Sequence, residues 1–149
     1  MSAEPPVALT SSLSFQIGVL GTAVADLFAA RVAPLGLKPK HAGLLAFLAN
    51  GGARSQAEAA AAMGVAPSLI VNLADRLEGL GALTRRRDPA DRRRQVLALT
   101  AEGTRLLQAC NRIAEDIDAD LTADLEAADT AALHRALTKM TGFPEPADG

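Results

Sequence analysis

Arginine is concentrated in one short stretch of this chain, where seven arginines and only three acidic residues lie between Arg76 and Arg94. Guanidinium groups form charge-assisted, often bidentate hydrogen bonds with phosphate, so the pattern predicts contact with a nucleic-acid backbone. A run of like charges is more commonly a solvated face, and charge alone does not separate these two interpretations. The arginines are at positions 76, 85, 86, 87, 92, 93 and 94.

The net charge of −2 does not oppose nucleic-acid binding, because the acidic residues are concentrated elsewhere. Seven acidic residues and no lysine or arginine lie between Glu115 and Asp129. Attraction to a polyanion depends on the local field, so a basic face on a mildly acidic protein can still bind DNA. We expect the acidic stretch to face away from the duplex.

Two short helices are predicted just before the arginine cluster. Ser55 and Glu58 have the spacing of a capping box, which predicts the start of a helix, and Gly64 predicts its end. Pro67 opens a second helix with apolar residues at helical spacing. These residues are Leu69, Ile70, Leu73, Leu77 and Leu80. The pair forms a helix-turn-helix, whose second helix can enter a major groove.

The arginine cluster itself is predicted to form a β-hairpin. Residues 83–87 and 95–99 have strand character, and the polar residues between them include Asp88, Pro89 and Asp91, which favour a turn. A basic hairpin beside a helix-turn-helix is a wing that can touch phosphates and a minor groove.

Long helices are expected toward both ends of the chain. Residues 12–32, 39–50, 101–125 and 129–141 carry apolar residues at helical spacing. The central residues cannot bury the apolar stripes of the terminal helices alone. We therefore expect a homodimer built from the first helix and the last two.

The composition fits a helical domain and argues against several other classes of protein. Of 149 residues, 49% are hydrophobic and only 3% aromatic, which favours closely packed helices. No unbroken apolar run approaches the roughly 20 residues of a membrane span, and no secretory signal is recognisable. The single Cys110 cannot form an intrachain disulfide, which suits a cytoplasmic protein. His41, His134 and Cys110 lack metal-site spacing, and no catalytic arrangement is recognisable, so we predict no metal, cofactor or enzyme activity.

Several motifs in this region resemble the signature of one family. Residues 75–78 (DRLE), Gly81, Arg86, residues 88–93 (DPADRR) and residues 99–103 (LTAEG) are similar in order and spacing to MarR-type winged helix-turn-helix transcriptional regulators. The resemblance covers nearly the whole chain.

The resemblance implies a mainly α fold with a small β-hairpin wing, built as a single MarR-type domain over residues 1–149. Residues 37–100 would form the DNA-binding region, and residues 11–33 and 101–142 the dimerisation helices. It further implies a triangular homodimer, acting as a repressor, on a pseudo-palindromic operator whose half-sites lie roughly 34 to 36 Å apart.

The candidate DNA contacts are Ser55, Gln56, Ser68, Leu69, Val71, Asn72, Arg76, Arg86, Asp91 and Arg93. By resemblance, Arg93 enters the minor groove, where the negative potential favours a guanidinium, and Asp91 braces the arginine or the turn. Asn72 can form two hydrogen bonds with adenine. Leu69 and Val71 either touch a thymine methyl group or pack in the core.

Other candidates also have purely structural alternatives. Arg76 either contacts a phosphate or forms a surface pair with Asp75 or Glu78. Ser55 either binds a phosphate at a helix N-terminus or serves only as the helix cap.

The resemblance also implies a small effector, because many family members release DNA when an aromatic acid or phenolic compound fills the crevice between the dimer helices and the winged domain. Phe15, His41, Phe47 and Arg112 are candidates for lining that crevice, with His41 or Arg112 pairing with a carboxylate. The alternative for His41 is a helix-start histidine that faces solvent.

Two rival functions stay open at this point. Aliphatic Leu69 and Val71 stand where the family usually has polar residues, which also fits a small-molecule-binding protein of the same fold with weak or lost operator recognition. Cys110 is either a buried inert thiol or a redox-active or nucleophilic one, and its place on an apolar stripe favours the inert thiol.

Overall fold

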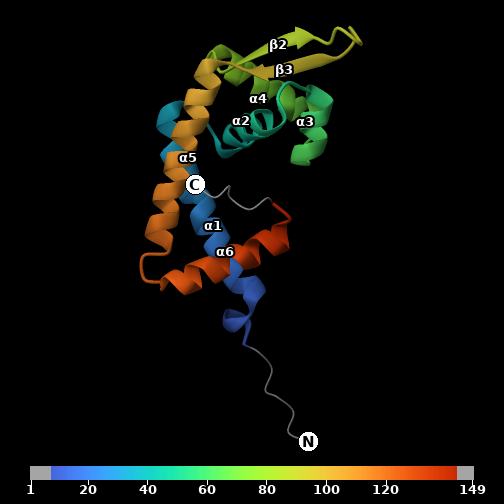
Figure 1. The fold of residues 1–149 in the computed structure, drawn as a ribbon. Coiled ribbons are helices and arrows are strands. Elements are labelled where there is room, and N and C mark those ends of the chain that lie inside the picture. The colour runs from blue at the N-terminus through green and yellow to red at the C-terminus, as the bar shows by residue number, and fades with distance from the viewer. Residues whose placement is uncertain (1–7, 144–149) are drawn as a thin grey trace, which may run out of the picture. The chain divides into compact units, whose positions relative to one another are not determined.

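The structure is a computed structural model that describes residues 8–143 of the chain. The helices are η1 (Leu9–Ser11), α1 (Leu13–Val32), η2 (Ala33–Leu35), α2 (Pro39–Gly51), α3 (Gln56–Met63), α4 (Pro67–Gly79), α5 (Ala101–Leu121) and α6 (Ala127–Thr141). The strands are β1 (Arg54–Ser55), β2 (Leu83–Arg87) and β3 (Gln95–Leu99) (Figure 1). The predicted fold class, mainly α with a small β-hairpin wing, is confirmed.

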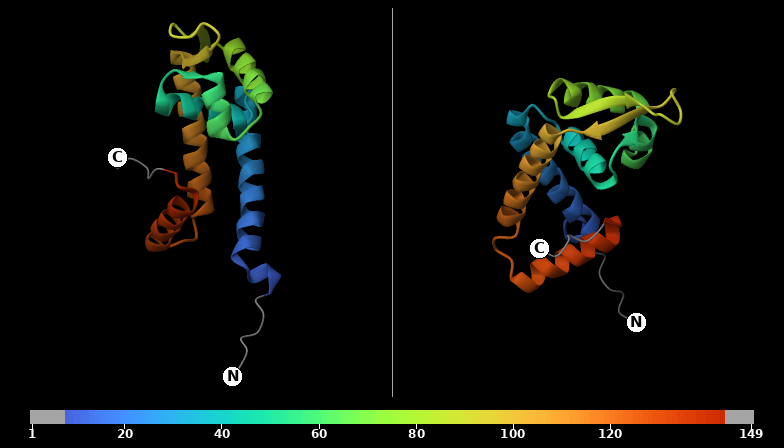
Figure 2. Two further views of the ribbon diagram at one scale, coloured as in Figure 1. Left: turned by 90° about the vertical axis from the view of Figure 1, so that its right-hand side faces the viewer. Right: turned by 45° about the horizontal axis from the view of Figure 1, so that its top comes forward.

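The described residues form two compact units, residues 8–114 and residues 115–143, and the boundary falls inside α5. The first unit holds α2, α3, α4 and the three-stranded sheet, which gather closely together in both views of Figure 2. The acidic stretch Glu115–Asp129 lies entirely in the second unit.

The helix-turn-helix begins and ends where local chemistry predicts. Ser55 Oγ accepts from the Glu58 N–H at 3.1 Å, and the Glu58 carboxylate accepts from the Ser55 N–H at 3.2 Å, so the capping box is confirmed. Gly64 ends α3 at φ 63°, a left-handed conformation that glycine adopts without steric cost. Pro67 occupies the first turn of α4, where its missing N–H is not needed.

The predicted helix 101–125 is shorter than expected. It ends at Leu121, and the next helix begins at Ala127 rather than Asp129. The apolar spacing continues to Leu125, but the Leu125 N–H bonds the Thr122 carbonyl at 3.0 Å in a turn. Periodicity therefore overestimated the length of the helix.

The sheet contains the predicted hairpin and one additional strand. Strands β2 and β3 pair antiparallel with Arg85 opposite Leu97, and β1 pairs with the other edge of β3. A two-residue strand has no period to detect, so β1 was missed. Because Ser55 both ends β1 and caps α3, the sheet is joined directly to the helix-turn-helix.

The core of the first unit lies between α2, α4, the sheet and the start of α5. Its largest fully buried side chains are Leu44, Leu45, Leu48, Ile70, Leu77, Leu83, Leu97 and Val32. Burying a leucine or isoleucine side chain contributes about 1.5 to 3 kcal/mol, so this cluster fixes how α4 lies against the sheet.

A tight junction joins the wing to α5. The Thr100 N–H donates to the Ala82 carbonyl at 3.1 Å, and Thr100 Oγ1 accepts from the Gly103 N–H at 3.1 Å. A Cβ on Gly103 would collide with the Ala82 carbonyl oxygen and lie 2.8 Å from Leu99 Cδ2. The motif at residues 99–103 is thus explained by close packing of α5 on the start of β2.

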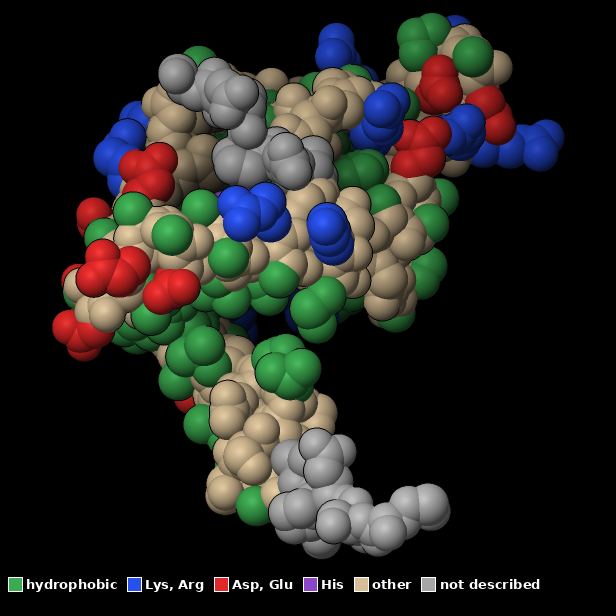
Figure 3. All heavy atoms as spheres, turned by 60° about the horizontal axis from the view of Figure 1, so that its bottom comes forward, with side chains coloured by type: hydrophobic (Ala, Val, Ile, Leu, Met, Phe, Trp, Pro, Cys, Tyr) green, Lys and Arg blue, Asp and Glu red, His purple; other side chains and the backbone are tan. Residues whose placement is uncertain are grey.

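Helix α1 exposes large apolar side chains within its own unit. Leu13, Ile17, Val19, Leu20 and Leu27 are all exposed, with Leu20 at 46%. Hydrophobic side chains also lie at the molecular surface in Figure 3. By length and composition alone, residues 13–35 could cross a membrane. The sequence pattern did not indicate this, because polar residues interrupt the apolar run. From the sequence we predicted that a single chain could not bury the apolar stripe of this helix, and the stripe is exposed here.

Candidate nucleic-acid interface

Helix α4 presents a mixed polar and aliphatic face to solvent. Ile70, Leu73, Ala74 and Leu77 are buried against the core. Ser68 and Asn72 are exposed, and Val71 is 39% exposed. Leu69 is partly buried and packs against the core, as its packing alternative predicts, and its contact with a thymine methyl group stays a prediction. The exposed candidates on the first turns of α4 are Ser68, Val71 and Asn72.

A hollow of about 280 Å³ joins the exposed face of α4 to the wing. It is lined by Ser55, Gln56, Ala57, Pro67, Val71, Arg93, Arg94 and Gln95. The hollow brings together the N-terminal ends of α3 and α4 and the turn end of the hairpin. Ser55, Gln56, Val71 and Arg93, four of the candidates from the sequence, thus share one site.

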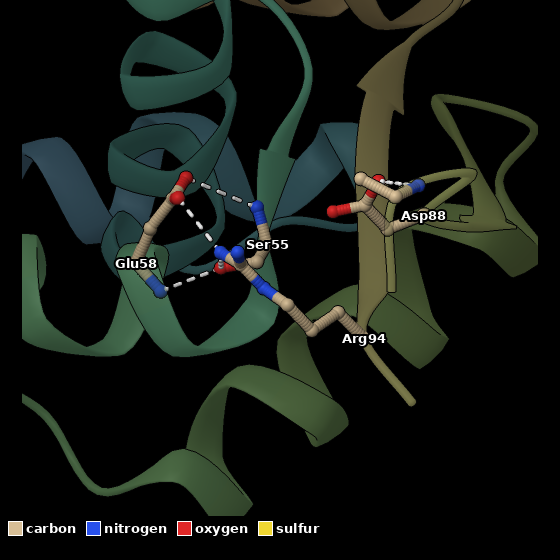
Figure 4. A network of polar contacts seen from close by, with 5 residues as sticks. Ser55, Glu58, Asp88 and Arg94 are labelled. Carbon is tan, nitrogen blue, oxygen red and sulfur yellow. Dashed lines mark hydrogen bonds and ion pairs between the residues drawn. The ribbon is translucent and has the colours of Figure 1, made fainter. Parts of the chain in front are cut away.

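Ser55 is buried and its hydroxyl is already engaged. The residue is 4% exposed, and Oγ accepts from the Glu58 N–H and from Arg94 Nη2, both at 3.1 Å. Arg94 Nη2 also lies 2.9 Å from Glu58 Oε1, so the arginine lies across the capping box (Figure 4). Ser55 therefore caps α3 as predicted, and its contact with a phosphate stays a prediction.

Arg85 points from β2 toward the two helices rather than toward solvent. Nη2 lies 2.7 Å from Asp75 Oδ1 and donates to the Val71 carbonyl at 3.0 Å, and Nη1 donates to Glu78 Oε1 at 3.2 Å. Nε donates to Gln56 Oε1 at 3.2 Å. From the sequence alone we could not decide whether Arg85 contacts a phosphate or only solvent, and its four intramolecular partners were not predicted.

Arg76 also has an intramolecular partner that the sequence did not indicate. Its Nε donates to the Gly36 carbonyl at 3.1 Å, which ties α4 to the loop after α1. The alternative for Arg76, a surface pair with Asp75 or Glu78, is not found among the described residues, where Arg85 pairs with both acids. Contact of Arg76 with a phosphate stays a prediction.

The wing turn is held by two aspartates. Asp91 Oδ1 accepts from the Arg93 N–H at 3.0 Å, and Asp88 Oδ1 accepts from the Ala90 N–H at 2.9 Å. Asp91 was expected to brace either the arginine side chain or the turn, and in the structure its carboxylate bonds the backbone of the turn. Such Asx turns replace backbone hydrogen bonds with side-chain ones and fix the loop.

The hairpin leaves three arginines with free guanidinium groups. Within residues 8–143, the side chains of Arg86, Arg92 and Arg93 make no hydrogen bond or ion pair, and all three are exposed. Arg87 Nη1 donates to the Arg92 carbonyl at 3.2 Å. The exposed end of the wing therefore carries uncompensated positive charge beside the hollow.

Comparison with known proteins agrees with this geometry. A model described as the MarR family matches residues 35–94. The transcriptional regulator HosA of Escherichia coli O111:H- is 32% identical over 103 residues, which make up 69% of this chain and 76% of HosA. The chain belongs to the MarR family.

Solved structures of MarR-type proteins have the same fold as this family member. Wild-type MarR of Escherichia coli in its apo form has a TM-score of 0.79 at 21% identity and covers 91% of this chain and 98% of its own. The repressor CouR bound to a 23-mer DNA duplex has a TM-score of 0.79 at 29% identity, covering 94% and 99%. CouR of Rhodococcus jostii RHA1 bound to p-coumaroyl-CoA has a TM-score of 0.74 at 26% identity, covering 96% and 100%.

Membership of the MarR family makes this chain a transcriptional regulator. Proteins of the family are regulators rather than enzymes, which supports the expectation that this chain has no enzymatic activity.

The effector candidates of this MarR-family regulator lie in different surroundings. Phe15 lines an apolar hollow of about 380 Å³ with Val19 and Leu20, and that hollow contains none of the other three. Phe47 packs partly buried against the core, and Arg112 is exposed on α5.

His41 is buried, so the expectation that it faces solvent is wrong. The side chain is 7% exposed, and Nδ1 accepts from the Lys38 N–H at 2.8 Å at the start of α2. Burial, followed by the positive charges of Arg76 and Lys38, lowers the pKa of His41 below its ordinary value. The neutral ring acts as a helix cap rather than as a cation.

Cys110 is a buried core thiol in this family member. It is 3% exposed, and burial raises its pKa, so the reactive thiolate is disfavoured. Within residues 8–143, no group of three or more histidine, cysteine or acidic residues is arranged to hold a metal ion.

Proposed function

We propose that this MarR-family regulator is a repressor that binds double-stranded operator DNA. The observation that carries the proposal is the hollow between α4 and the wing, where the exposed face of α4 meets the unpaired Arg93. A helix with a solvent-facing polar side and an adjacent cationic hairpin match a major groove and the minor groove beside it. The DNA-bound CouR structure supports the same use of this fold.

The exposed side chains favour an operator rich in A·T pairs near the recognition helix. Asn72 can bond adenine through N6 and N7, and Val71 can contact a thymine methyl group. Arg93 would enter the minor groove, and Arg86 and Ser68 would contact phosphates. The first turns of α4 contain no arginine for guanine, and Arg76 in the last turn bonds the Gly36 carbonyl.

We infer that the regulator acts as a homodimer through its terminal helices. In the first unit, α1 leaves Leu13, Ile17, Val19 and Leu20 exposed. In the second unit, Leu121, Leu125, Leu133, Leu137 and Met140 are exposed. Exposed apolar residues repeated along helices are typical of interfaces, and a two-fold dimer would present two recognition helices to a pseudo-palindrome.

We further propose a small aromatic effector that favours one spacing of the two recognition helices over another. Support comes from CouR, whose solved complex with p-coumaroyl-CoA has this fold. Phe15 and Arg112 remain candidates for contacting it, Phe15 because it lines an apolar hollow and Arg112 because it is exposed. The response can be no larger than the difference in effector affinity between the two states.

The rival function is a small-molecule-binding protein of the same fold with weak operator recognition. The observation that favours it is Val71, an exposed aliphatic residue on the face of α4 that would meet DNA. Val71 is consistent with both functions, since it can contact thymine.

Fluorescence polarisation with the chain's own promoter region and a random duplex of equal length separates the two functions. We expect specific binding to the promoter that falls about 10³- to 10⁵-fold between roughly 50 and 200 mM salt, if about six to ten phosphates are contacted. Equal affinity for both duplexes would favour the rival function. Specific binding that is independent of salt would overturn the role of the wing.

A further inference from the structure

The arginines of the wing divide into two groups by their surroundings. Arg86, Arg92 and Arg93 are exposed and make no side-chain polar contact within residues 8–143. Arg85 and Arg94 instead bond residues of the helix-turn-helix. Arg85 lies in β2, and Arg94 directly precedes β3. The sequence presents all five as one basic cluster, but their chemistry in the fold differs.

Arg85 uses all three guanidinium nitrogens on partners in α3 and α4. Its side chain is only 17% exposed, and it bonds one backbone carbonyl, one amide oxygen and two carboxylates. The carboxylates of Asp75 and Glu78 neutralise its charge at 2.7 and 3.2 Å. Four of the five N–H donors of this guanidinium are thus directed at α3 and α4, which leaves it poorly placed to bind a phosphate.

Arg94, which directly precedes β3, makes a more exposed contact with α3, since its side chain is 46% exposed. Nη2 bonds the hydroxyl of Ser55 at 3.1 Å and the carboxylate of Glu58 at 2.9 Å, at the N-terminal end of α3 (Figure 4). Both groups already cap that helix, so the arginine binds atoms that are fixed in place.

We propose that Arg85 and Arg94 are positioning residues that hold the wing against both helices of the helix-turn-helix, and that Arg85 makes no contact with DNA. The inference rests on the proposed DNA-binding function. It assigns Asp75, Glu78 and Glu58 a role in promoting binding, although each carries a negative charge close to the surface that would face phosphates. A wing fixed in advance loses less conformational entropy when it enters a groove.

This inference reverses the expected direction of the change in DNA affinity for two variants that each remove a negative charge. Asp75→Asn and Glu58→Gln each remove one negative charge near DNA, which by electrostatics alone should tighten binding. Glutamine at the third helical position still completes a capping box, so Glu58→Gln removes the ion pair and keeps the cap. If the acids position the wing, each variant weakens binding, by about two- to fivefold for Asp75→Asn, whose carboxylate is largely exposed.

Two controls separate positioning from phosphate contact. Arg86→Met removes the neighbouring exposed arginine of β2 and should reduce the slope of log affinity against log salt by about 1. Arg85→Met should weaken binding while the slope stays that of the parent chain. Glu102→Gln removes an acid that pairs with Arg105 on α5, and it should change neither affinity nor slope.

Hydrogen–deuterium exchange of the full chain without DNA gives a readout that does not depend on the operator. Amides of residues 83–99 should exchange faster in Arg85→Met than in the parent, and at the parent rate in Arg86→Met. Faster exchange together with weaker binding at unchanged slope supports the inference. Tighter binding by Asp75→Asn, or a reduced slope in Arg85→Met, overturns it. A parent chain that binds no DNA specifically would overturn the proposed function instead, and the exchange data would still report whether the two arginines hold the wing.

Discussion

Arg93 and Arg94 are adjacent in sequence but meet different surroundings. Arg94 crosses the capping box of α3, whereas the Arg93 side chain is exposed beside the hollow and only its backbone N–H is bonded, by Asp91. The turn that presents Arg93 is therefore held by the backbone and does not depend on the guanidinium. Removing that side chain should affect DNA and leave the fold intact.

Arg93→Ala is expected to weaken operator binding by about 1 to 3 kcal/mol, because a guanidinium in a groove is lost without disturbing the Asx turn. Polarisation titrations measure the affinity, and circular dichroism checks that helix content is unchanged. Arg135→Ala makes the same charge change on exposed α6 and serves as the matched control. Equal effects of the two variants would exclude Arg93 from the site.

His41 should make stability depend on pH. Its folded-state pKa is lowered by burial and by Arg76 and Lys38, so the unfolded chain binds a proton more readily. The stability that the neutral ring supplies is present above the unfolded pKa of about 6.5 and is lost as pH falls below it. Urea midpoints should therefore fall from pH 7.5 to pH 5.5, and less so in His41→Gln. If His134→Gln, a change on α6, removed the dependence instead, the assignment to His41 would fail.

The elements are held in register by a few close contacts, of which the one between β2 and α5 has the least room. Gly103 has no side chain because the Ala82 carbonyl occupies the place of a Cβ. The start of α5 therefore rests directly on the strand that carries Arg85 and Arg86.

Gly103→Ala is expected to destabilise the chain by about 1 to 3 kcal/mol, because the helix start must move away from Ala82 and Leu99. Denaturant unfolding measures the change. Gly79→Ala is the control, since a Cβ there meets nothing within 4 Å and alanine is the better helix former. A Gly103→Ala chain as stable as the parent would show that the junction tolerates a methyl group.

At the scale of the whole molecule, the exposed apolar residues of α1 require a covering surface, and a second copy of the chain is the one we propose. Leu20→Glu places a charge in the apolar hollow that also contains Phe15 and Val19. Burying an unpaired carboxylate is costly, so the variant should be monomeric at micromolar concentration and bind operator weakly.

Light scattering after size-exclusion chromatography measures the mass of this variant. Asn50→Asp, which adds the same charge at the exposed end of α2, should stay dimeric. A parent chain that is itself monomeric at these concentrations would refute the proposed dimer.

Local chemistry in the sequence determined most of the fold. The capping box at Ser55, the turn at Gly64 and the polar residues between the two strands act over a few neighbours, and the hairpin has the predicted strand bounds. The sequence did not predict two local features correctly. Strand β1 has only two residues, and the end of α5 lacks a strong stop signal.

Only the tertiary structure decided which side chains remain free for DNA. Arg85 and Gln56 are 29 positions apart, Arg94 and Ser55 are 39 apart, and Arg76 and Gly36 are 40 apart. No local sequence pattern encodes contacts between residues so far apart, because they depend on how α3 and α4 pack against the sheet and the core. Residue type and order therefore predicted a basic wing, whereas the packing of α3 and α4 determined which arginines it holds inward and which it leaves to solvent.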